Sequence, residues 1–136
     1  MSKIVIKNIT KKFSSVELKD FFDKTLPGKS NKQCEKIIKN SSIIIGAFKE
    51  RELIGIGRAL DDGVYGFITD LIVKEQFRGK GVGTNLAKNL VDKLFRKNIK
   101  IIHCPTSKKL LSFYKRVASF NFDKDDITIY FNNFTF

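Results

Sequence analysis

The apolar residues of this chain recur at two spacings, which predict strands and helices in a definite order. Residues 3–9 alternate between apolar and polar positions, as a half-buried first strand does. Two stretches at helical spacing follow, the first with Leu18, Phe21, Phe22 and Leu26 and the second with Cys34, Ile37 and Ile38. Each begins at a serine, Ser14 or Ser30, with Glu or Gln three residues later, which is the capping-box pattern of a helix start. Pro27-Gly28 separates the two predicted helices.

Three apolar runs come next, and turn-forming residues separate them. They cover Ile43–Phe48, Leu53–Leu60 and Tyr65–Val73. The charged residues 49–52 and the sequence Asp61-Asp62-Gly63 between these runs are typical of hairpin turns. We therefore expect three antiparallel strands in sequence order, with Tyr65–Val73 as the central strand.

The second half of the chain predicts a helix, a strand, a helix and a closing strand. Leu86, Leu90, Val91 and Leu94 indicate a helix over residues 83–97, and residues 99–104 read as a strand that Pro105 ends. A helical crossover makes this strand parallel to the central one. Thr106 or Ser107 would cap a last helix that carries Leu110, Phe113, Tyr114 and Val117. A turn over 123–126 and a strand over 127–131 complete the prediction.

Three glycines at alternate positions, Gly79, Gly81 and Gly83, stand where the central strand gives way to a helix. Alternate glycines remove every second side chain, so that backbone N–H groups can converge on an anion beside the positive end of the helix dipole. Arg78 and Lys80 add full positive charges. The turn therefore predicts a site for a phosphate-bearing ligand, although it matches neither the Walker nor the dinucleotide glycine pattern.

The segment resembles the acetyl-CoA signature Q/R-x-x-G-x-G/A of the GCN5-related N-acetyltransferases, with Gln76, Gly79 and Gly81 at its defined positions. A second resemblance is Phe113-Tyr114, which is similar to a helical segment of that family. The resemblance implies one α+β domain over 1–136, with three layers. Its sheet would be mixed, mostly antiparallel, of six or seven strands, flanked by about four helices. It would splay open between the central strand and the parallel strand that follows.

The resemblance also implies a cofactor site for acetyl-CoA. The backbone of the central strand would pair with the pantetheine arm at Leu71, Ile72 and Val73. The residues expected at the pyrophosphate are Gln76, Arg78, Gly79, Lys80, Gly81, Val82, Gly83 and Thr84, with backbone N–H groups offered from Arg78 onward. Ser107 stands where the family often has an asparagine, and Ala118-Ser119-Phe120 replaces the usual glycine-phenylalanine pair.

The implied reaction is direct attack of a primary amine, carried by a small molecule or a peptide, on the thioester within a ternary complex. Tyr114 would protonate the departing thiolate. Some family members carry a glutamate base where this chain has Phe67, so Asp70 is the remaining candidate base, with a structural role as its alternative. His103 and Cys104 point to opposite sides of a strand and form no catalytic pair.

Charge and composition leave two other functions open. Lys and Arg outnumber Asp and Glu by 26 to 14, a net charge of +12. The excess lies in residues 1–40 and 84–120, so a basic nucleic-acid-binding module is one alternative, disfavoured because no known nucleic-acid motif is present. A non-catalytic acetyl-CoA binder is the other.

The cysteine content and the lack of targeting signals lead us to expect a cytoplasmic protein. No apolar run reaches the ~20 residues of a membrane span, and the start lacks the layout of a signal peptide. Cys34 and Cys104 are expected to be reduced thiols, and no metal-binding spacing is present. We expect no metal, no membrane, and a monomer or homodimer.

Overall fold

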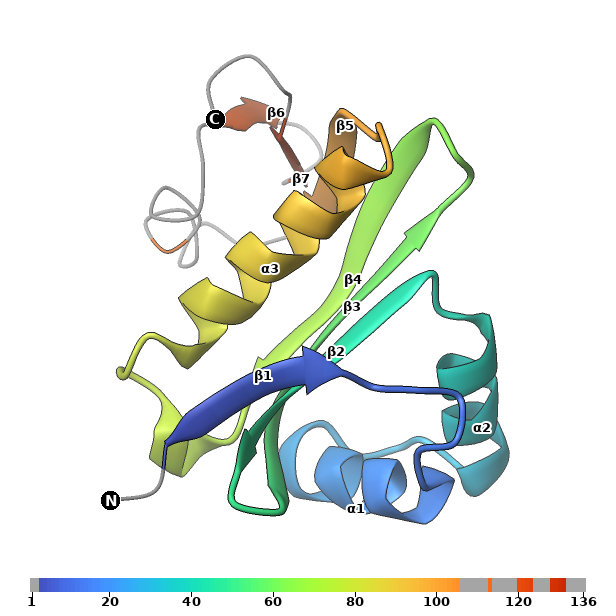
Figure 1. Ribbon diagram of the computed structural model, residues 1–136, viewed down its shortest axis with the longest axis vertical. Coiled ribbons are helices and arrows are strands. Elements are labelled where there is room, and N and C mark those ends of the chain that lie inside the picture. Colours follow the sequence, from blue (N-terminus) through green and yellow to red (C-terminus); the bar gives the residue numbers. More distant parts are fainter. Residues whose placement is uncertain (1–2, 106–112, 114–119, 124–127, 132–136) are drawn as a thin grey trace.

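The computed structural model describes residues 3–105, 113, 120–123 and 128–131, and these build one mixed sheet with helices on both faces (Figure 1). The strands are β1 (Ile4–Asn8), β2 (Ile43–Lys49), β3 (Glu52–Asp61), β4 (Tyr65–Val73), β5 (Ile101–Pro105), β6 (Phe120–Asp123) and β7 (Thr128–Phe131). Their order in the sheet is β1-β2-β3-β4-β5-β7-β6. The described helices are α1 (Ser15–Thr25), α2 (Asn31–Asn40), α3 (Val82–Arg96) and a 3-10 turn, η1 (Glu75–Phe77).

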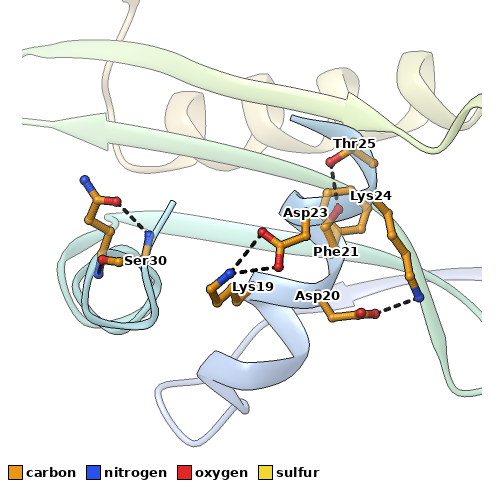
Figure 2. Close-up of polar contacts among 8 residues, drawn as sticks. Lys19, Asp20, Phe21, Asp23, Lys24, Thr25 and Ser30 are labelled. Carbon is orange, nitrogen blue, oxygen red and sulfur yellow. Dashed lines mark hydrogen bonds and ion pairs between the residues drawn. The ribbon is translucent and has the colours of Figure 1, made fainter. Parts of the chain in front are cut away.

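Local capping explains where the first two helices begin. The Ser14 hydroxyl accepts the Glu17 N–H at the start of α1, and Ser30 and Gln33 form a complete capping box at α2. Pairs of Lys and Asp one turn apart, Lys19–Asp23 and Lys24–Asp20, run along α1 (Figure 2). Both helix starts predicted from the sequence are therefore confirmed.

The core is divided into two layers by the sheet. Leu18, Phe21 and Phe22 of α1 and the apolar side of α2 pack on one face of β2 and β3. On the other face, Leu86, Leu90 and Leu94 of α3 pack against β2, β3 and β4. Gly57 lets α3 approach closely, because an added Cβ there would lie 2.9 Å from a Leu90 methyl group.

β4 is paired along its whole length on one side and only at its beginning on the other. Its register with β3 runs from Asp61↔Gly66 to Gly55↔Val73 and contains a bulge at Thr69. Its parallel register with β5 covers only Tyr65↔Ile101, Gly66↔Ile102 and Phe67↔His103. β5 then continues along β7, so the sheet opens between β4 and β5 as expected.

The second half of the chain corrects several boundaries. α3 begins at Val82 rather than Gly83, and Ile99 lies outside the strand because its N–H closes the end of α3 on the Leu94 carbonyl. Pro105 is the last residue of β5 rather than a break before it, since its partner there is Thr128 of an antiparallel neighbour. β6 was not predicted. The expected fourth helix lies outside the described residues apart from Phe113.

Candidate active site

A cavity of about 750 Å³ lies where the β4–β5 opening meets the glycine turn. It is lined by Leu71, Ile72, Val73, Arg78, Gly79, Gly81, Val82, Gly83 and Thr84, all predicted from the sequence, and by Thr25, Leu26, Phe77 and Phe113. Leu71 and Val73 belong to the α3 side of the sheet and Ile72 to the α1 side. The cavity therefore reaches both faces, because β5 no longer fills the space beside β4.

The amides of the turn have the arrangement that an anion site requires. Gly79 and Gly81 have positive φ angles of 77° and 83°, and an added Cβ at either would meet nothing within 4 Å. No side chain caps α3, whose first intrahelical bond runs from Asn85 N–H to the Gly81 carbonyl. Among the described residues, the amides of Gly79 to Thr84 have no acceptor, and they stand at the N-terminal end of α3 beside the cavity.

The three glycines of the turn have two different roles. Gly79 and Gly81 supply the left-handed backbone and open space. Gly83 lies inside α3, where an added Cβ would come within 3.3 Å of the Phe113 ring. The amide of Arg78, predicted to face the phosphates, is already bonded to the Glu75 carbonyl. The available donors therefore begin after Arg78.

The free edge of β4 can be assigned from its hydrogen-bond alternation. Lys74 N–H donates to the Ile54 carbonyl at 2.9 Å, so Lys74 and, two residues earlier, Ile72 turn their backbone groups toward β3. The backbone groups of Leu71 and Val73 consequently face the opening. The Val73 carbonyl accepts the Arg78 Nε at 3.0 Å, so among the described residues Val73 N–H and both backbone groups of Leu71 remain for an extended ligand.

Two other predicted cofactor residues lie beside the cavity rather than on its wall. Gln76 lines a separate cavity of about 490 Å³ with charged residues of α1 and β3. The Lys80 ammonium lies 5.6 Å from the centre of the Phe77 ring, and the Lys49 ammonium lies 5.5 Å from it. These lysines give the turn end a positive field without lining the cavity.

Asp70 is held by an ion pair. Its Oδ2 accepts the Arg58 Nε at 2.7 Å, both side chains are largely buried, and Arg58 also donates to the Ser41 hydroxyl at 3.4 Å. Asp70 does not line the cavity. This arrangement favours the structural alternative, because the Arg58 guanidinium engages the carboxylate and the carboxylate lies outside the cavity.

Phe67 and His103 form the last pair before β4 and β5 separate. Their rings are stacked, with centroids 5.2 Å apart and planes 22° from parallel, and Tyr65 meets the His103 ring edge-on at 6.0 Å. Cys104 is buried on the other side, so the two residues lie apart as expected. Tyr114 and Ser107 lie outside the described residues, and their roles stay predictions.

Four lining residues were not predicted as site residues. Leu26 was placed on the apolar side of α1, yet it is the C-cap residue and is 52% exposed at the cavity. The Thr25 hydroxyl donates back to the Phe21 carbonyl at 2.8 Å (Figure 2). Phe77 and Phe113 are ordinary apolar positions in the sequence, and only the sheet opening brings the four together.

Comparison with known proteins identifies the fold and the family. The model of the acetyltransferase (GNAT) family matches residues 10–120. The chain belongs to this family. An N-acetyltransferase described as uncharacterized, ycf52 of Pyropia yezoensis, is 30% identical over 92 residues, which are 64% of this chain and 53% of the relative. The chain thus spans about half the length of that relative.

Solved GNAT structures share the architecture at low sequence identity. The PaiA N-acetyltransferase of Thermoplasma acidophilum, solved with coenzyme A, has a TM-score of 0.77 at 14% identity, over 96% of this chain and 99% of that one. A GNAT acetyltransferase of Elizabethkingia anophelis with acetyl-CoA bound has a TM-score of 0.70 at 22% identity, over 89% and 78%. The α+β fold with its opened mixed sheet is therefore confirmed.

The described residues contain no group of three or more His, Cys, Asp and Glu side chains placed to hold a metal ion. None of the helices among them has the length and apolar character to cross a bilayer. Both cysteines are buried in the core, and burial raises the pKa of Cys34.

Proposed function

We propose that this GNAT protein transfers an acetyl group from acetyl-CoA to a primary amine by direct attack within a ternary complex. The cavity beside β4 carries the proposal, because it combines anion-binding amides at one end with a free strand edge along its wall. A pyrophosphate suits the amides from Gly79 to Thr84. An extended amide-bearing arm suits the edge at Leu71 and Val73.

The residues present suit the chemistry of the transfer. A backbone N–H on the opened edge of β4 would polarise the thioester carbonyl as the amine attacks it. The C–S bond breaks as the C–N bond forms, and Tyr114 would give its proton to the departing sulfur. The proton that the nitrogen loses as it becomes an amide would restore the Tyr114 phenol. The attacking amine must first lose a proton, which costs about 4 kcal/mol at neutral pH for an alkylamine of pKa ~10.

The proposal is tested by titrating acetyl-CoA into the protein and then following thiol release with a panel of primary amines. We expect binding in the micromolar range and thiol release that depends on the amine. No heat of binding at tens of micromolar would overturn the proposal. Binding without thiol release for any amine would reduce the protein to an acetyl-CoA binder.

The proposed role of Tyr114 has its own test. Replacing it by phenylalanine removes the phenol proton and keeps the ring, so turnover should fall by about 10²-fold or more while the Kd for acetyl-CoA stays unchanged. Unchanged turnover of Tyr114→Phe would remove Tyr114 from the mechanism without affecting the proposed reaction.

A further inference from the structure

The face of β4 and β5 next to the opening carries exposed apolar side chains. Tyr65 is 43% exposed, Phe67 42%, Ile101 39% and Leu60 36%. They share one face, because Leu60 lies opposite Phe67 and Tyr65 opposite Ile101 in the strand registers. His103 joins them through its ring contacts with Tyr65 and Phe67. We call Tyr65, Phe67 and His103 the aromatic platform.

This face is the one that α1 and α2 cover farther along the sheet. Ile56 packs under these helices, and Arg58 and Leu60 follow it at alternate positions of β3. The α1–α2 cluster contains no residue of the platform. Among the described residues, the two helices therefore leave the platform open to solvent.

The platform lies at the closed end of the β4–β5 opening. Phe67 and His103 are the last paired residues, and the cavity begins at Leu71. Three residues of strand lie between Phe67 and Leu71, which places the two residues about 10 to 13 Å apart at the usual rise per residue. A thioester arm that ran along this edge from the glycine turn past Leu71 would direct its acetyl group toward the platform.

Contact geometry then restricts the acceptor. The attacking nitrogen must come within about 3 to 3.5 Å of the thioester carbonyl carbon. The rest of the acceptor consequently rests on the surface beside the closed end. Arg58 and Asp70, the neighbouring charged groups on this face, are already bonded to each other. Among the described residues, a second ammonium group on the acceptor would meet only carboxylates that are already engaged, Asp70 by Arg58 and Asp62 by the Val64 and Tyr65 amides, and the net charge of +12 opposes a polycation.

We propose that the acceptor is a small primary amine carried on an aromatic ring, which packs on the platform of Tyr65, Phe67 and His103. This inference rests on the proposed function, since it names the substrate class of that site. The stacked Phe67 and His103 rings and the edge-on Tyr65 offer a flat apolar surface to a further ring.

The experiment compares 2-phenylethylamine, butylamine and spermidine as acceptors at saturating acetyl-CoA. We expect kcat/KM for 2-phenylethylamine to exceed the other two by about tenfold, which corresponds to about 1.4 kcal/mol of added ring contact. Phe67→Ala should abolish this preference through KM. Val5→Ala is the control, because Val5 is 53% exposed on the opposite edge strand β1.

A second readout does not depend on turnover. Saturation-transfer NMR should detect contact between the ring protons of 2-phenylethylamine and the CoA-loaded protein, and Phe67→Ala should remove that contact. Equal kcat/KM for the three amines, a preference for spermidine, or no NMR contact would overturn the inference. So would a dimer in sedimentation that Phe67→Ala dissociates, since the platform would then be a subunit interface.

Failure of the inference and failure of the proposed function are distinguishable. Acetyl-CoA that does not bind contradicts the proposed function itself. Acetyl-CoA that binds and is consumed with amines, but without preference for the ring, contradicts only the aromatic acceptor.

Discussion

The two ends of β4 differ in how many strands they pair with, and this difference separates the closed part of the sheet from the opening at the cavity. Gly66 and Phe67 are paired with β3 on one side and β5 on the other, whereas among the described strands Leu71–Val73 is paired with β3 alone. β5 covers the edge of the paired end, whereas the edge of the other end lines the cavity. A strand with one free edge keeps backbone groups available for a ligand, so in the proposed function one strand serves as both core and binding surface.

The two ends also use glycine differently. At the closed end, a Cβ on Gly66 would lie 3.2 Å from Ile99 and 3.3 Å from Leu94, so glycine there allows close packing. At the open end, Gly79 and Gly81 have free space and positive φ, so glycine allows a backbone shape and a ligand. Substitutions at the closed end should therefore affect stability, and those at the open end should affect binding.

The largest expected effect is at the open end. Gly81→Glu places a negative side chain and a strained backbone where the phosphates are proposed to bind, so acetyl-CoA affinity should fall by more than about 100-fold, or ~2.7 kcal/mol. Gly63→Glu is the matched control, because Gly63 also has a positive φ, 92°, and open space, but lies in the β3–β4 turn. Titration calorimetry measures the acetyl-CoA affinity of both variants. An equal loss of affinity in both would show that backbone strain alone causes the effect.

The matching change at the closed end is Gly66→Val. Its methyl groups must displace Ile99 and Leu94, so we expect the free energy of unfolding in urea to fall by about 1 to 3 kcal/mol. Acetyl-CoA affinity of the folded protein should stay within about twofold. If Gly66→Val keeps normal stability but loses acetyl-CoA binding, the closed end of β4 also contributes to binding and the comparison fails.

Arg78→Ala should have a smaller effect. It removes the bond from Nε to the Val73 carbonyl and one positive charge beside the cavity, so the Kd for acetyl-CoA should rise about tenfold, or ~1.4 kcal/mol. Arg96→Ala is the control, since Arg96 is exposed at the other end of α3. If both variants bind alike, net charge rather than the position of Arg78 accounts for the affinity.

The smallest effect concerns pH. Burial by itself would raise the pKa of Asp61, but its hydrogen bonds with Lys97, the Gly63 amide and Ser42 outweigh it and lower that pKa. The ionised Asp61 carboxylate therefore stabilises the folded protein fully at pH values above its unfolded pKa. This stabilisation is lost as the pH falls through the lower pKa of the folded state. Asp61→Asn should reduce the loss of stability below about pH 4. Identical urea midpoints against pH in both proteins would contradict this.

Much of the fold follows from local patterns in the chain. The bounds of Tyr65–Val73 agree with β4, and both serine caps are found where they were expected. Strand ends were less predictable, as Pro105 shows, because the partner strand decides where pairing stops. β6 was missed because four residues carry too little periodicity to indicate a strand.

The site divides in the same way. The glycine turn was predictable because φ above zero and absent side chains are properties of single residues. Thr25, Leu26, Phe77 and Phe113 were not, because each reads as an ordinary position in its own element. Asp70 appeared as a candidate base from its place in the strand, and only its register with Arg58 reveals the ion pair.

The chain alone determined most of the order of elements, the helix caps and the glycine turn, since each depends on contacts within a few residues. The tertiary structure decided where β5 leaves β4, which backbone groups that departure frees, and which side chains surround the opening. These depend on pairing between segments more than thirty residues apart, and no local pattern encodes the point at which such pairing ends.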